Sequence, residues 1–78
     1  MLDKKLINDL KAKIEALVIA IPKEQAAYEF YMDITSKYED EGAKEMFLFL
    51  AKQEASHKAM LERILGDLEG KLEQAMLE

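Results

Sequence analysis

Hydrophobic side chains recur along this chain in steps of mostly three and four residues, on either side of a charged stretch that ends at Gly42. The first stripe comprises Leu10, Ile14, Leu17, Ile21, Tyr28, Tyr31, Thr35 and Tyr38, and the second comprises Ala43, Phe47, Leu50, Leu61, Ile64, Leu68, Leu72 and Ala75. This spacing marks one face of an α-helix, and no stretch alternates with the period of two that is typical of a strand. We therefore predict an all-α fold in which two long antiparallel helices, residues 3–39 and 42–75, form a hairpin that spans 1–78 as one domain.

Pro22 is the one residue that interrupts the first predicted helix. A proline inside a helix removes a backbone hydrogen bond and clashes with the preceding turn, at a cost of about 3 kcal/mol. Either residues 3–39 form one helix that is kinked near Pro22, or a first helix ends near Ala20 and another begins with Pro22 at its first position. We favour the single kinked helix.

Three polar residues occupy positions where each stripe requires an apolar side chain. Steps of three and four from Ile21 lead to Glu24, and the same steps from Leu50 lead to Glu54 and His57. A buried carboxylate without a partner is costly and ordinarily takes up a proton. Their positions therefore predict that a charge-compensating group lies between the helices.

The depth of these residues along the helices indicates what that group is. With a rise of 1.5 Å per residue, Glu24 lies roughly 25 Å from the turn along one arm, and Glu54 and His57 lie about 20–24 Å along the other. The polar layer is therefore central, and a twofold axis across the middle of two hairpins would superimpose two such layers. The resulting four Glu and two His match the ligand set of di-iron and di-manganese four-helix bundles.

Composition and charge narrow the functional classes further. A chain of 78 residues builds a marginal core without help from a metal or from oligomerisation, and without cysteine it has neither disulfides nor a Cys-ligated site. Its net charge of −5, with no basic cluster, argues against a nucleic-acid partner. The longest apolar run, 16–21, is too short to span a membrane, so we expect a cytoplasmic protein with no membrane partner. We assign the charges of Lys52 and Lys58 to solvated faces.

The ligand types indicate which divalent metals the site would suit. Four carboxylates and two divalent ions sum to zero charge, so a filled site can be buried. Carboxylate and imidazole ligands suit iron or manganese, and zinc also binds them.

Two segments, 21–31 and 47–57, resemble the ferritin-like superfamily and, within it, the rubrerythrins and encapsulated ferritins. The shared pattern is a Glu followed seven residues later by a Tyr, here Glu24 and Tyr31, and then Glu-x-x-His, here Glu54 and His57. The resemblance implies that Glu24 and His57 are terminal ligands, that Glu54 is a bridging carboxylate, and that Tyr31 is a hydrogen-bond partner behind them. It also implies two irons per homodimer, or per dimer within a higher oligomer, and a ferroxidase or rubrerythrin-like oxidoreductase that uses O2 or peroxide.

An alternative interpretation is a non-enzymatic helical dimerisation module with a structural polar layer. Chance readily places a Glu three residues before a His in a Glu-rich chain. The common depth of Glu24, Glu54 and His57 favours the metal site over this alternative.

Overall fold

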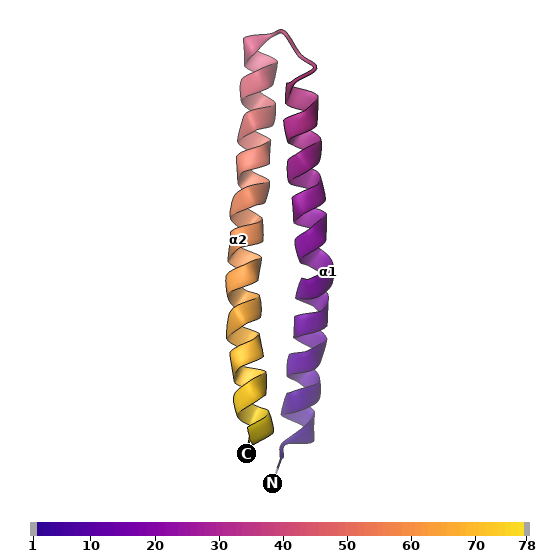
Figure 1. Ribbon diagram of the computed structural model, residues 1–78, viewed down its shortest axis with the longest axis vertical. Coiled ribbons are helices and arrows are strands. Elements are labelled where there is room, and N and C mark those ends of the chain that lie inside the picture. Colours follow the sequence, from indigo (N-terminus) through magenta and orange to yellow (C-terminus); the bar gives the residue numbers. More distant parts are fainter. Residues whose placement is uncertain (1, 78) are drawn as a thin grey trace.

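The two predicted helices are present and pack along their whole length. The computed structural model describes residues 2–77, which form α1 (Lys4–Thr35) and α2 (Glu41–Leu77) and no strand. The helices lie antiparallel, with the connection at one end and both termini at the other (Figure 1). The hairpin measures 62 × 14 × 12 Å, so it is a thin rod. The predicted all-α hairpin is confirmed.

Helix α1 begins with a side-chain cap and continues past Pro22 without a break. The Asp3 carboxylate accepts a hydrogen bond from the backbone N–H of Leu6 at 3.0 Å, which satisfies a donor that the helix itself leaves free. Because Pro22 lies inside one continuous helix, the alternative with a helix end near Ala20 is excluded.

The connection between the helices lies slightly earlier than the apolar pattern predicted. Helix α1 ends at Thr35 rather than 39, where the hydroxyls of Thr35 and Ser36 bond to the carbonyls of Tyr31 and Asp33 at 2.7 and 2.6 Å. Helix α2 begins at Glu41 because the Asp40 carboxylate accepts from the backbone N–H of Ala43 at 2.9 Å. Side-chain hydrogen bonds to the backbone are therefore found at the end of α1 and at the start of α2.

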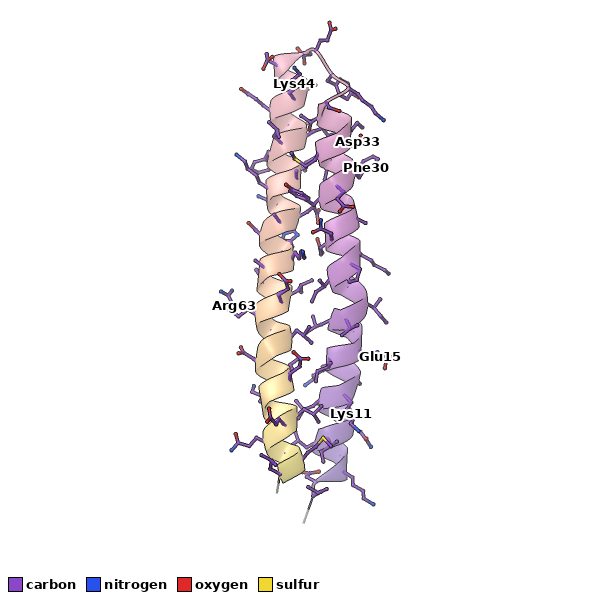
Figure 2. The ribbon with its side chains drawn as sticks, in the orientation of Figure 1. Lys11, Glu15, Phe30, Asp33, Lys44 and Arg63 are labelled. Carbon is purple, nitrogen blue, oxygen red and sulfur yellow. The ribbon has the colours of Figure 1, made fainter. Side chains whose placement is uncertain are left out.

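The core of the isolated hairpin is small. The buried hydrophobic residues in the described part of the chain are Ile7, Leu10, Ala51 and Ala75. Large apolar side chains remain exposed on both helices, and Figure 2 shows Phe30 pointing outward from α1. Apart from the few buried residues, the hairpin therefore leaves large apolar side chains in contact with water.

Neither helix, over residues 2–77, combines the length and the apolarity that a membrane span requires.

Candidate metal centre

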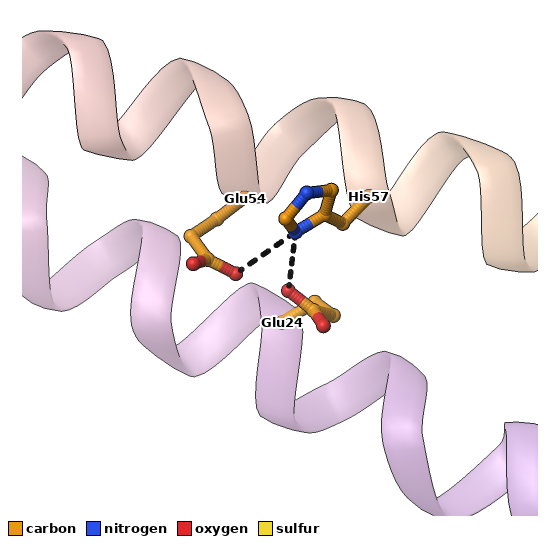
Figure 3. A group of neighbouring side chains, drawn as sticks. All are labelled: Glu24, Glu54 and His57. Carbon is orange, nitrogen blue, oxygen red and sulfur yellow. Dashed lines mark ion pairs between the residues drawn. The ribbon is translucent and has the colours of Figure 1, made fainter.

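Glu24, Glu54 and His57 come together between the helices at mid-length. Glu24 lies on α1 two residues after Pro22, and Glu54 and His57 lie one turn apart on α2. Each offers one ligand atom, and these atoms lie within 4.8 Å of one another. Figure 3 shows all three side chains turned toward a common point. The residues that the sequence placed at one depth are thus neighbours in space.

The distances within this cluster fit a shared cation. The Nδ1 atom of His57 lies 3.6 Å from Oε2 of Glu24 and 3.8 Å from Oε2 of Glu54. These distances exceed those of hydrogen bonds, so His57 forms no hydrogen bond with either carboxylate. Ligand atoms that each lie about 2.0–2.2 Å from one ion are at most roughly 4.4 Å apart, and both distances fall within that limit.

One buried atom of the cluster lacks a hydrogen-bond partner. Oε2 of Glu24 is buried and accepts no hydrogen bond from residues 2–77. A buried acceptor without a donor costs free energy, and the cost is larger for a charged group. A cation beside Glu24 would remove this cost, so the orphaned oxygen supports the fit of a metal ion.

The two carboxyl groups also perturb each other. The pKa of Glu54 is raised above its ordinary value of 4.5, first because a protonated Glu54 can donate a hydrogen bond to the carboxylate of Glu24. Loss of water around Glu54 and the charge of Glu24 raise the pKa further, whereas His57 lowers it. Proximity of the two carboxyl groups therefore disfavours the doubly ionised pair, and a cation between them would oppose this effect.

The cluster is open on one side. The side chain of His57 is 49% exposed, compared with 26% for Glu24 and 21% for Glu54. On this side, helical steps of three and four connect the cluster to apolar residues of both helices, which we call the open face. The open face comprises Leu17, Ala20, Ala27 and Ile34 of α1 and Met46, Leu50, Met60, Ile64 and Leu68 of α2.

Tyr31 packs in an aromatic group between the cluster and the turn. Its ring lies edge-on to Phe30 at 5.5 Å and stacks on Phe47 at 6.4 Å, and Phe47 in turn stacks on Tyr38 at 5.3 Å. Tyr31 is two turns beyond Glu24 on the same helix. Its hydrogen bond to the cluster stays a prediction.

Sequence reasoning missed a polar contact beside the cluster. Lys58, which we assigned to a solvated face, is partly buried, and its ammonium group donates to Oε1 of Gln25 at 3.0 Å. The Gln25 amide nitrogen donates to Glu29 at 3.0 Å. The sequence does place Gln25 directly after Glu24 and Lys58 directly after His57, which indicates that both side chains lie near the cluster. It does not indicate that they contact each other.

Comparison with known protein families gives a match that includes the cluster. The sequence model of the Rubrerythrin family matches residues 15–78, which include all three residues of the cluster. No match was found among curated proteins or among solved structures. The family is ferritin-like and binds iron, and the carboxylate–histidine group is consistent with that chemistry. Because the match covers most of the sequence, the chain belongs to the rubrerythrin family.

Proposed function

We propose that two copies of this chain form a four-helix bundle that holds two iron ions and oxidises Fe(II) with O2 or peroxide. The observation that carries this proposal is the central cluster of Glu24, Glu54 and His57, in which a buried carboxylate oxygen has no hydrogen-bond partner. Family membership supports iron as the metal.

A second copy is needed because one hairpin supplies only three ligands. Hairpins whose turns lie at opposite ends place two clusters at the same level, since each cluster is at mid-length. The pair then offers four carboxylates and two imidazoles, which is the ligand set of di-metal bundles of this type. Four negative charges balance two divalent ions, so the site can lie in the interior of the bundle.

The open face is the surface on which we place the second copy. Met46 is 52% exposed, Met60 47% and Ile64 40%, although all three are apolar and share the side of α2 on which His57 is open. Burial of this face against its own copy removes apolar area from water and covers His57 in one step. The stability of the dimer and the completion of the metal site therefore both depend on contact between the two open faces.

The residues of the cluster have distinct roles in this proposal. Glu24 and His57 are terminal ligands, Glu54 is the carboxylate shared between the two ions, and Tyr31 holds a hydrogen bond behind them. Glu54 binds the ion in its ionised form, and the cation opposes the rise in its pKa that the neighbouring Glu24 causes. Bound iron supplies the one-electron oxidation chemistry that these side chains lack.

The test is metal analysis combined with Fe(II) oxidation kinetics. We expect about one iron per chain in the wild type, as for two ions in a bundle of two chains, with loss of iron and of oxidation in Glu54→Ala and His57→Ala. Lys52→Ala, an exposed change two residues before Glu54, is the matched control and should keep both. A wild-type dimer that binds no metal would refute the proposal.

The exposed apolar surface also favours a second candidate, a helical dimerisation module without chemistry. Both candidates form dimers, so dimerisation does not separate them. Added Fe(II) or Mn(II) does, because only a metal-binding protein is stabilised by the ion. The di-iron proposal requires a rise in Tm for the wild type and none for Glu54→Leu, whereas the dimerisation module shows no rise in either.

A further inference from the structure

One side-chain hydrogen bond joins the two helices within residues 2–77, and it lies beside the cluster. It runs from the Lys58 ammonium group on α2 to Oε1 of Gln25 on α1, over 3.0 Å. The other side-chain hydrogen bonds of the described residues connect positions three or four apart on the chain. Within the described residues, the Lys58–Gln25 bond and the His57–Glu24 ion pair at 3.6 Å are therefore the polar contacts that connect α1 to α2 at this level.

The carboxamide of Gln25 is held at both ends. Its oxygen accepts from Lys58, and its nitrogen donates to Glu29 at 3.0 Å. The amide cannot rotate without loss of both bonds, and the positive charge of Lys58 is matched through it by the carboxylate of Glu29. This arrangement makes the link directional, because only one orientation of the amide serves both partners.

The link lies on the side of the cluster away from the open face. Successive helical residues are turned by about 100° around the helix axis, so Gln25 and Lys58 sit next to Glu24 and His57 but on the adjoining side. A shallow hollow there is lined by Gln25, Tyr28, Ala55, Lys58, Ala59 and Glu62. One side of the cluster is thus braced by a polar link, and the other is left open.

We propose that Lys58 and Gln25 are positioning residues, which set the rotation of α1 and α2 so that Glu24 meets Glu54 and His57. This inference rests on the proposed metal-binding function. A change in the rotation of either helix moves the ligand atoms apart, because each ligand is attached to the same turn as one partner of the link. Polar partners behind metal ligands commonly affect metal affinity by about 10- to 100-fold.

The experiment measures Mn(II) affinity and the absorption spectrum of the Co(II)-saturated protein in the full chain. Lys58→Met and Gln25→Leu should each weaken Mn(II) binding by roughly tenfold or more and alter the Co(II) spectrum. The double variant should lose little more than either single variant, because both changes break the same bond. Lys58→Arg retains a hydrogen-bond donor, so its Co(II) spectrum should match that of the wild type. Lys52→Met makes the same chemical change at an exposed position and should keep the wild-type affinity and spectrum.

The outcomes separate this inference from the function on which it rests. If the wild type binds neither Mn(II) nor Co(II), the proposed function fails. If the wild type binds both, and Lys58→Met and Gln25→Leu match it in affinity and spectrum, the positioning role alone is overturned. A lower Tm of the metal-free variants with an unchanged Co(II) spectrum also overturns it, because that result indicates a structural role only.

Discussion

The substitution Glu24→Leu should change the stability of the protein in opposite directions without and with metal. In the metal-free protein the substitution removes a buried carboxylate oxygen that has no hydrogen-bond partner. Leaving such a group unsatisfied costs about 1–3 kcal/mol, and we take the low end because the Glu24 side chain is still 26% exposed. We therefore expect metal-free Glu24→Leu to be more stable than the wild type by about 1 kcal/mol, which corresponds to a Tm higher by roughly 4–8 °C in a domain of this size.

Added metal should reverse the order. An ion present at 100 times its dissociation constant stabilises the protein that binds it by about 2.7 kcal/mol. The wild type gains this free energy, whereas Glu24→Leu lacks a ligand and gains little. The wild type should then become the more stable of the two by about 1–2 kcal/mol, the difference between these two effects.

The assay is thermal unfolding at one fixed protein concentration, with and without Mn(II), because the Tm of a dimer depends on concentration. Glu15→Leu is the control, since Glu15 is exposed and points away from α2 (Figure 2). It makes the same chemical change without access to the cluster, and it should keep the metal-induced rise in Tm. A metal-free Glu24→Leu that is less stable than the wild type, or one that keeps the metal-induced rise, would refute the reasoning.

Three further predictions follow from the same structure. Because the folded-state pKa of Glu54 is raised, Glu54 should contribute stability to the metal-free protein that is fully present below pH 4.5 and is lost as pH rises through that higher pKa; denaturant titrations across this range should lack this contribution in Glu54→Gln. Gly66→Ala and Gly70→Ala should each raise the free energy of unfolding by about 0.5–1 kcal/mol in denaturant titrations, because the added Cβ meets no atom within 4 Å; a destabilised variant would contradict this. Ile64→Asp should yield monomers in analytical ultracentrifugation and abolish metal binding, whereas Ile19→Asp, on an exposed residue outside the open face, should leave the dimer intact; dimers of Ile64→Asp would contradict the proposed interface.

The depth of the cluster was predictable from the sequence, and the ends of the helices were not. Helical rise is nearly constant, so counting residues from the turn was enough to bring Glu24 level with Glu54. The end of α1 instead depends on hydroxyl groups near Ser36, and the start of α2 depends on the Asp40 cap, neither of which affects the apolar period. Local hydrogen bonds therefore moved the boundaries by a few residues.

The Lys58–Gln25 link was beyond prediction for a different reason. Both side chains are long and flexible, and the sequence does not say which of their rotamers the packing selects. Lysine is also most often exposed, so the pattern favoured the solvated face. The exposure of His57 was equally hidden, because it depends on what covers the open face and not on the residues of one hairpin alone.

The position of the two termini at one end of the rod has a consequence for a tandem gene fusion. In the proposed dimer the turns lie at opposite ends, so the end of α2 in one copy and the start of α1 in the other are separated by nearly the 62 Å length of the rod. An extended chain covers about 3.3–3.6 Å per residue, so a linker that joins two copies head to tail needs about 18 residues or more. A shorter linker cannot reach and would force both turns to the same end, so the shortest linker that preserves metal binding in a fusion reports the relative orientation of the two hairpins.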